Sequence, residues 1–547
     1  MTTDFSSVPG APASSDLAAL AHLHSALIGV NYTYDGIEDL LGARAFEAMT
    51  RDQIVPGLYR IRQVLGEEKT HESFTAQQRQ LAQVVRFFLF GQEVGQDELG
   101  AALGSEVAGL LVELGVAEPA GTGGFLQAAV DLRPHAADDG TELLVASDLG
   151  AHQRPGVLRK DHVLGIGHAS LTLAQLTERT PVDRALDLGT GCGIQVFHLL
   201  AHARHVTATD ISERALAFTR FNLVLNAPAL GLDPANLEER VSLRLGSLLE
   251  PVAGEQFNLV VSNPPFVITP RSDHETPEDQ YTYRDGGMAG DGIVSTLVQQ
   301  LPGVLAPGGR AQMLGNWEIP VDGQDGPADW ADRPRAWVGE QTEAWFIQRE
   351  VLEPEQYAET WLRDASENRD PAHYEAAYTA YLRDFAARGV GSIGFGMIWL
   401  RKPQPGTTGD RLHRFEEITY PIQQPIAPFI TEAVDHWDTT TALTDDDLLE
   451  QHLVVAGDVT EERHAPPGSE HPSVILLRAG AGLRRTILET TETSGFVSAC
   501  DGDLSVGQIL GALAALLGWE GDEPRRVLIS NIRELLEKGF LVIDPQD

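Results

Sequence analysis

The chain has 547 residues, of which 42% are hydrophobic and 22% are charged, and its net charge is −39. This composition excludes a disordered or fibrous protein, and the length predicts about three or four domains. The acidity disfavours broad binding to nucleic-acid phosphates, which normally requires a basic surface.

Signals for secretion or membrane insertion are not expected. The opening stretch MTTDFSSVPGAPASSDLAAL has no basic segment followed by an apolar one. No apolar run reaches the roughly 18 residues of a membrane-spanning helix. The two cysteines, Cys192 and Cys500, cannot form a disulfide framework. We therefore expect a cytoplasmic protein that does not enter a membrane, and its oligomeric state stays unknown.

Residues 1–150 predict a mainly helical amino-terminal domain. Residues 1–15 are rich in Ser, Pro and Ala and are expected to form a loose tail. In residues 16–50 apolar side chains recur at helical spacing, at Leu17, Leu20, Leu23 and Leu27.

A winged-helix order is expected between residues 74 and 147. Three short helices separated by glycines precede a two-stranded stretch. The second and third helices, within residues 95–115, carry four acidic residues and no Lys or Arg. We therefore expect this domain to pack against a neighbour or gate a substrate rather than to read DNA.

Residues 151–405 predict an α/β domain with a Rossmann-like, seven-stranded sheet. Strand and helix patterns alternate, as in a parallel sheet with crossover helices. The strands are expected at 184–188, 205–209, 241–245, 257–262, 309–314, 344–351 and 394–400.

The remaining residues predict a connecting region and a second winged-helix-like domain. The link KPQPGTTGD opens a connecting region at 406–475. Residues 476–547 are the predicted carboxyl-terminal domain, with helices at 504–517 and 527–537 and a wing strand at 539–543. This segment has more acidic than basic residues, which favours an interaction or dimerisation module over a nucleic-acid reader.

The stretch ALDLGTGCGIQVFHLL predicts a strand, a glycine-rich turn and a helix. Gly189, Gly191 and Gly193 allow close approach of a ligand to the backbone. A dinucleotide fingerprint would need Gly or Ala where Ile194 stands. Asp187, two residues before the first glycine, favours a positively charged ligand over a pyrophosphate.

Two further strand ends carry polar residues suited to a nucleoside. Asp210 ends the second strand, where a carboxylate can bind both hydroxyls of a ribose. Ser247 follows the third strand, where an adenine ring would lie. Together with the glycine loop, these residues are a stronger signal than the loop alone.

The fourth strand ends in VVSNPPF. Proline cannot donate to a sheet and restricts the residue before it, so the strand stops here and holds Asn263 and Phe266 at its carboxyl end.

These motifs together resemble the class I S-adenosylmethionine-dependent methyltransferases over about residues 155–402. The resemblance implies an enzyme with S-adenosyl-L-methionine as its cofactor and no metal. The segment YRDGGMAGDGIVSTLVQQL is similar to the one after NPPY in HemK/PrmC-like protein-glutamine methyltransferases, and RNA and DNA amino-methyltransferases share the NPP motif. The cofactor-binding residues implied are Asp187, Gly189, Thr190, Gly191, Gly193, Asp210, Ile211, Ser247, Leu248 and Asn263. The family usually has Asp at the position of Ser247.

The resemblance also assigns catalytic roles to Asn263, Pro264 and Phe266. The Asn263 side-chain oxygen and the Pro264 carbonyl would accept both N–H groups of a planar nitrogen, and Phe266 would stack on the acceptor. Catalysis is then alignment with partial charge stabilisation, without a dedicated base.

The expected reaction is N-methylation of a protein or peptide glutamine or asparagine side chain. The alternative acceptor is a nucleobase exocyclic amine, adenine N6 or guanine N2, in RNA or DNA, and a third alternative is a non-catalytic cofactor-binding scaffold. Asp161, His162 and Gly165–Ser170 precede the first strand, where related enzymes place a lip of the cofactor pocket, so they are expected to contact the cofactor or the substrate. The expected substrate contacts are Tyr281, Tyr283, Arg284 and His168.

Overall fold

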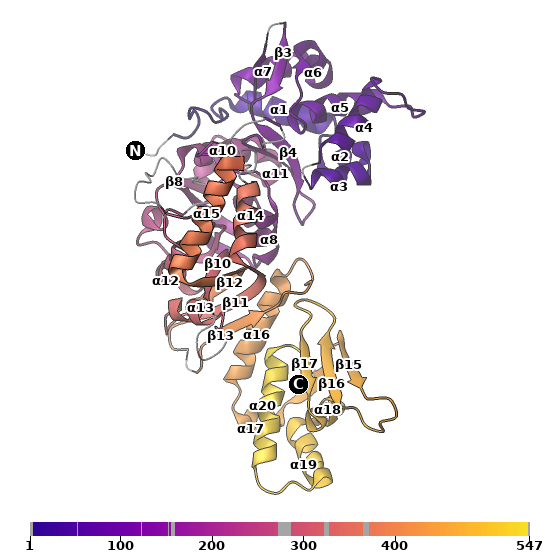
Figure 1. Cartoon of the computed structure of the whole chain (residues 1–547), viewed down its shortest axis with the longest axis vertical. Coiled ribbons are helices and arrows are strands. Elements are labelled where there is room, and N and C mark those ends of the chain that lie inside the picture. The colour runs from indigo at the N-terminus through magenta and orange to yellow at the C-terminus, as the bar shows by residue number, and fades with distance from the viewer. Residues whose placement is uncertain are drawn as a thin grey trace. The chain divides into compact units, whose positions relative to one another are not determined.

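The computed structural model describes residues 4–51, 53–121, 123–150, 153–154, 159–271, 286–321, 328–364, 371–407 and 409–544. The chain folds into two compact units, one of residues 1–174 and 180–403 and the other of residues 175–179 and 404–547 (Figure 1). Over the described ranges, every helix is too short or too polar to cross a membrane.

The first unit is built around a sheet with the strand order β11-β12-β10-β9-β6-β7-β8. Adjacent strands from β10 to β8 are parallel, whereas β12 is antiparallel to both β10 and β11. The bounds are β6 Val182–Leu188, β7 Ala203–Asp210, β8 Val241–Leu245, β9 Phe257–Ser262, β10 Leu305–Pro320, β11 Glu343–Leu352 and β12 Val390–Arg401. The predicted α/β class is confirmed, and the seven expected strands correspond to these seven strands.

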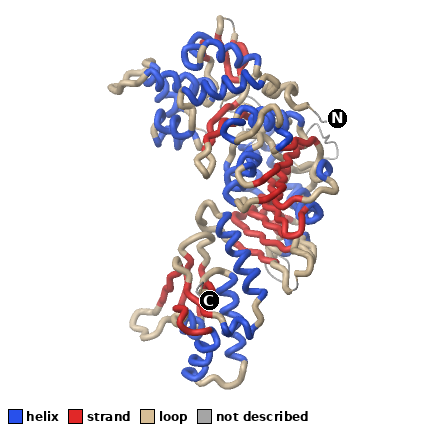
Figure 2. The backbone as a smooth tube through the Cα atoms, turned by 180° about the vertical axis from the view of Figure 1, so that it is seen from behind, coloured by secondary structure: helices blue, strands red, loops and turns tan. Residues whose placement is uncertain are grey.

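Helices cover this sheet, and its strands run between them in Figure 2. The helical segments are α8 His168–Leu176, α9 Ile194–Leu200, α10 Glu213–Leu225, α11 Ala227–Leu230, η1 Leu237–Glu239, η2 Glu250–Val252, α12 Gly292–Val304, α13 Asp332–Trp337, α14 Pro354–Asp364 and α15 Pro371–Arg388. The strand order reverses between β6 and β9, so their carboxyl ends form the crevice where open α/β sheets bind ligands.

The described helices and strands of the amino-terminal region include the expected helices and more strands than the expected two-stranded stretch. They are α1 Leu17–Gly29, α2 Tyr34–Leu41, α3 Ala43–Met49, α4 Val55–Leu65, α5 Ala76–Phe88, β1 Val94–Gly95, α6 Gln96–Leu103, α7 Ser105–Glu113, β2 Ala117–Ala120 and β3 Phe125–Ala128. The three strands pair in the order β1-β3-β2. The winged-helix description of this region and the boundary at residue 150 stay predictions.

A second hairpin, β4 Asp131–Ala136 and β5 Glu142–Ser147, is bonded to helix α10 of the α/β core. Asn222 lies in the last turn of α10 and Asn226 caps the carboxyl end of this helix, and both are buried. The Asn222 amide pairs with the backbone N–H and C=O of Ala146 at 2.8 and 2.9 Å, and Asn226 pairs in the same way with Leu144 at 2.8 and 2.7 Å. Two side-chain amides thus continue the hydrogen bonding of β5.

The prediction of a loose tail at residues 1–15 is wrong for the described part of this segment, which follows Met1–Thr3. Phe5 is 4% exposed and packs against Leu216 and Ala217 of α10. The hydroxyl and the carbonyl of Ser14 accept hydrogen bonds from Arg220 Nη1 at 2.6 and 2.7 Å. The sequence did not reveal these contacts. The segment has no helix or strand pattern, and its partners lie about two hundred residues further along the chain.

The second unit contains two small antiparallel sheets, β18-β14-β19 and β15-β16-β17. From residue 404 onward the elements are β13 His413–Glu417, α16 Ala427–Ala442, α17 Asp445–Glu450, β14 His452–Val455, β15 Val459–His464, β16 Val474–Ala479, β17 Thr486–Glu489, α18 Thr491–Val497, β18 Asp501–Ser505, α19 Val506–Leu517, α20 Glu523–Glu537 and β19 Leu541–Ile543. The two expected helices and the expected wing strand correspond to α19, α20 and β19. The winged-helix description of this unit stays a prediction.

Candidate active site

A cavity of about 370 Å³ opens at the carboxyl ends of β6 and β9. Many of the residues expected from the motifs line it: Gly189, Thr190, Gly191, Asp210, Ile211, Ser247, Leu248, Asn263 and Pro264. The segment expected as a lip contributes His162, Gly165 and Ser170. The crevice between β6 and β9 and the sequence motifs therefore identify the same site.

Some residues that the sequence predicts for the site do not line the cavity. Asp187, Gly193, Phe266 and His168 are not among the described residues that line the cavity. Tyr281, Tyr283 and Arg284 lie outside the described residues.

The glycine loop is fixed against the end of β7. Gly189 and Gly191 have φ values of 79° and 57°, in the left-handed region that favours glycine. The backbone N–H groups of Gly189 and Thr190 both donate to the Thr209 carbonyl at 2.9 Å. The loop therefore holds its shape through the strand beside it.

Asp187 stabilises this loop through a hydrogen bond. Its side chain is fully buried, and its Oδ2 accepts a hydrogen bond from the Thr190 hydroxyl at 2.7 Å. Burial raises the pKa of Asp187 to about 7. Gly193 also acts through packing, because a Cβ there would lie 3.0 Å from Thr219 Cγ2. Both residues shape the loop without lining the cavity.

Asp210 joins the glycine loop to the start of α10. Its Oδ2 accepts from the Gly191 N–H at 3.0 Å, and its Oδ1 accepts from the Ser212 N–H at 2.8 Å. Burial raises the pKa of this carboxyl above its usual value. A carboxylate fixed at both oxygens and lining the cavity has the geometry to receive ribose hydroxyls.

Asn263 occupies the end of β9 across from the loop. Ser262 Oγ donates to the Leu188 carbonyl at 2.8 Å, which ties the ends of β9 and β6 together. Among the described residues, the buried Asn263 Oδ1 has no hydrogen-bond partner. Such an unpaired buried acceptor costs about 1–3 kcal/mol, which is tolerated where function needs it.

The backbone after Asn263 is held by two residues that the sequence motifs do not reveal. Asn316 Nδ2 donates to the Phe266 carbonyl at 2.7 Å and to the Tyr357 hydroxyl at 3.2 Å. The same hydroxyl accepts from the Ile268 N–H at 2.7 Å. Asn316 and Tyr357 are both fully buried, so the NPPF segment is anchored to β10 and α14. Asn316 is one of several polar residues in β10, so no sequence pattern singles it out.

Cys192 lines the cavity but is not placed as a nucleophile. Burial raises the pKa of its thiol to about 12, which keeps the group protonated near neutral pH. Within the described ranges, no group of three or more His, Cys, Asp or Glu is arranged to hold a metal ion.

S-adenosylmethionine fits this set of residues. The cofactor is cationic at its sulfur and its amino group. The carboxyl group of Asp210 lines the cavity, and that of Asp187, in β6, is hydrogen-bonded to Thr190 of the glycine loop. Ser247 and Leu248 line the cavity where the sequence motifs expect the adenine.

Two family models match the chain. Residues 148–278 match the methyltransferase small domain, and residues 29–128 match a domain of unknown function, DUF7059. The match and the sheet define the central part of the chain as a class I S-adenosylmethionine-dependent methyltransferase domain.

Within this class the domain is similar to the HemK/PrmC-like methyltransferases. The release factor glutamine methyltransferase of Deinococcus radiodurans is 37% identical over 144 residues, 25% of this chain and 47% of that protein. The ribosomal protein uL3 glutamine methyltransferase of Bradyrhizobium diazoefficiens is 30% identical over 159 residues, 28% of this chain and 46% of that protein.

A relative that acts on RNA is also similar. The ribosomal RNA small subunit methyltransferase C of Idiomarina loihiensis is 33% identical over 121 residues, 22% of this chain and 32% of that protein. The chain thus spans less than half the length of each of these three relatives.

Proposed function

We propose that the chain transfers a methyl group from S-adenosylmethionine to the side-chain amide nitrogen of a glutamine or asparagine in a cytoplasmic protein or peptide. The observation that carries this proposal is the unpaired Asn263 Oδ1, which among the described residues has no partner and lies buried at the edge of the cavity that the glycine loop and Asp210 also line.

An amide nitrogen needs orientation because its lone pair is delocalised. The Asn263 side-chain oxygen and the Pro264 carbonyl accept its two N–H groups and turn the lone pair toward the cofactor. The cofactor supplies an electrophilic methyl group on a positively charged sulfur. With S-adenosylmethionine bound, the new N–C bond would form as the C–S bond breaks with its electron pair going to sulfur, and the nitrogen would then lose a proton to water. Alignment in a fixed site supplies much of the rate enhancement.

The identity of the acceptor is supported by the relatives and by charge. Two of the relatives described above are named as glutamine methyltransferases of a release factor and of ribosomal protein uL3. A net charge of −39 opposes the approach of a polyanion. Both observations favour a protein acceptor.

A nucleobase amine is the second candidate, and the similar ribosomal RNA methyltransferase favours it. Adenine N6 and guanine N2 are planar nitrogens with two N–H groups, and the same two acceptors suit them.

The experiment is transfer of tritium-labelled methyl groups into a lysate of cells from which the gene has been deleted, so that the acceptor is unmethylated. We expect label that is lost on protease treatment and retained on nuclease treatment. Label lost to nuclease would support the nucleobase amine. No transfer by a chain that binds the cofactor would indicate the scaffold.

A further inference from the structure

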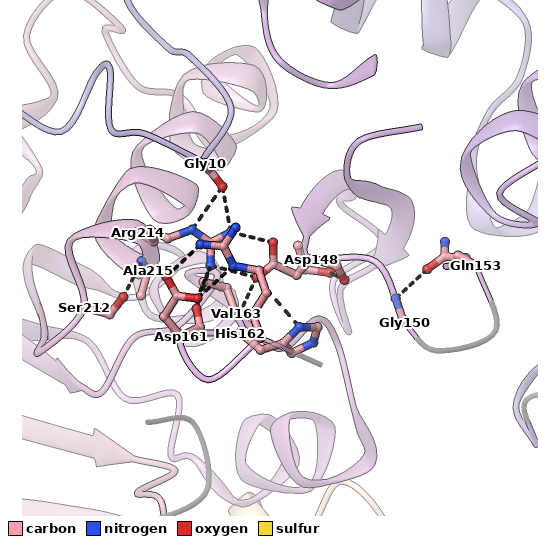
Figure 3. Close-up of polar contacts among 12 residues, drawn as sticks. Gly10, Asp148, Gly150, Gln153, Asp161, His162, Val163, Ser212, Arg214 and Ala215 are labelled. Carbon is pink, nitrogen blue, oxygen red and sulfur yellow. Dashed lines mark hydrogen bonds and ion pairs between the residues drawn. The ribbon is translucent and has the colours of Figure 1, made fainter. Parts of the chain in front are cut away.

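A buried arginine lies beside the cavity, outside the sequence motifs. Arg214 is in the first turn of α10, two residues after Ser212, and its side chain is only 7% exposed. Its guanidinium contacts Gly10 near the N-terminus and also Asp148 and Asp161, which precede the first strand of the α/β sheet (Figure 3).

All five N–H donors of Arg214 are used. Nη2 and Nη1 donate to Asp148 Oδ1 and Oδ2 at 2.7 and 3.0 Å. Nη1 also donates to the Asp161 carbonyl at 2.6 Å. The Gly10 carbonyl accepts from Nη2 at 2.6 Å and from Nε at 3.0 Å. The N-terminal segment therefore completes the bonding of this guanidinium.

Asp148 links Arg214 to the wall of the cavity. Its Oδ2 accepts from the Val163 N–H at 2.8 Å, and its own N–H donates to the Val163 carbonyl at 3.1 Å. Val163 lines the cavity together with its neighbours His162, Leu164 and Gly165. Asp148 therefore fixes both backbone groups of a wall residue.

The other side of the cavity begins at the same helix turn. Asp210, Ser212 and Ala215 line the cavity, and Ser212 is bonded to Asp210 at 2.8 Å. The Arg214–Asp148 ion pair thus joins two walls, residues 162–165 and residues 210–215. A buried ion pair with saturated hydrogen bonds is rigid, and removal of one partner leaves the other charge uncompensated.

We propose that Arg214 and Asp148 are positioning residues for the cofactor: the pair holds residues 161–165 against the α10 side of the cavity and keeps the cavity in its binding shape. The N-terminal segment takes part through the Gly10 carbonyl. The inference rests on the proposed function only in taking this cavity as the cofactor site.

The test is calorimetric titration of the full chain with S-adenosylhomocysteine, which requires no methyl acceptor. The variants are Arg214→Lys and Asp148→Asn. Asp148→Asn keeps a side-chain oxygen that can accept from the Val163 N–H, so this variant still tests the proposal if Arg214→Lys folds poorly. The matched control is Arg220→Lys, because Arg220 lies on the same helix and binds the same N-terminal segment at Ser14. Its hydrogen bonds go to that segment and not to residues 161–165.

We expect Kd to rise about tenfold or more for both variants, with a stoichiometry near one, and about twofold or less for Arg220→Lys. The double variant should weaken binding by less than the product of the two single effects, since the residues act as a pair.

A lower stoichiometry at unchanged Kd would mean that the pair only supports folding and would overturn the proposal. Equal weakening by Arg220→Lys would overturn it as well. Normal binding by both variants would contradict this proposal alone, whereas no binding by the unaltered chain would contradict the proposed function itself and this inference with it.

Discussion

The two sides of the cavity differ in how their polar groups are paired. On the cofactor side, the carboxylate of Asp210 and the N–H groups of Gly189, Thr190 and Gly191 are already hydrogen-bonded within the protein. On the acceptor side, Asn263 Oδ1 has no partner among the described residues. On the cofactor side the glycine loop and Asp210 are thus fixed before ligand binding, and among the described residues only side-chain oxygens such as Asp187 Oδ1 and Thr209 Oγ1 lack partners there. The acceptor side instead keeps the Asn263 side-chain oxygen available at a cost of about 1–3 kcal/mol.

The largest expected effect comes from the acceptor side. Asn263→Ala should lower kcat/KM for methyl transfer by about 10²–10³-fold, because one positioned acceptor for the reacting nitrogen is lost. The Kd for S-adenosylhomocysteine should change by about threefold or less. Asn258→Ala, at the other end of β9, is the control and should retain activity. An active Asn263→Ala enzyme would contradict the proposed mechanism.

Tyr357→Phe tests whether the anchor of the NPPF segment belongs to the acceptor side. The variant loses the hydroxyl that binds the Ile268 N–H and the Asn316 amide, so kcat should fall about tenfold while cofactor Kd is unchanged. Tyr378→Phe removes a hydroxyl that binds Glu355 in the same helix pair and should have no effect on kcat. If Tyr357→Phe changed only the Kd for the cofactor and not kcat, the anchor of the NPPF segment would belong to the cofactor side, which would contradict this expectation.

The cofactor side should respond to pH through Asp187. Its pKa is about 7 in the cofactor-free protein, so acidification below pH 7 neutralises a carboxylate near a cationic ligand. Kd for S-adenosylmethionine should be constant above that pH and rise by up to about tenfold per unit below it. Because the folded-state pKa is raised, the folded protein binds more protons than the unfolded chain between about pH 4 and 7, and stability falls as pH rises through this range.

Asp187→Asn should flatten both profiles, as measured by equilibrium dialysis and by denaturant unfolding. Asp183→Asn, an exposed carboxylate on the same strand, should leave them unchanged. A pH-dependent Kd that persists in Asp187→Asn would assign the titration to another group.

The smallest effect is expected at Ser247. Ser247→Ala removes one neutral hydrogen-bonding group from the cavity, so cofactor Kd should rise about two- to tenfold. Ser295→Ala, whose hydroxyl bonds only to the Gly292 carbonyl among its described contacts, is the control. No change in Ser247→Ala would mean that this residue does not contact the adenine.

The sequence predicted the cofactor side well because its signals are local. Glycines with positive φ, an acid at a strand end and alternating strands and helices all lie within about one hundred residues. The strand ends at Leu188, Leu245 and Ser262 agree with the predicted ends.

The parts that sequence patterns did not reveal depend on contacts between distant segments. Asn316 reaches the Phe266 carbonyl across 50 positions, and Arg214 reaches Gly10 across 204. Neither contact has a spacing that a helix or strand would impose. The expected contact of Phe266 with the acceptor cavity also depended on a side-chain direction, and the described structure does not include Phe266 in the lining.

The most direct test of the proposed reaction is the chemical form of the transferred methyl group. Acceptor labelled by the unaltered chain and tritiated S-adenosylmethionine should release labelled methylamine on acid hydrolysis, as an N-methylated side-chain amide does, and this label should become volatile once the hydrolysate is made alkaline. Recovery of the label on a purine base, or as methanol from an ester, would contradict the account.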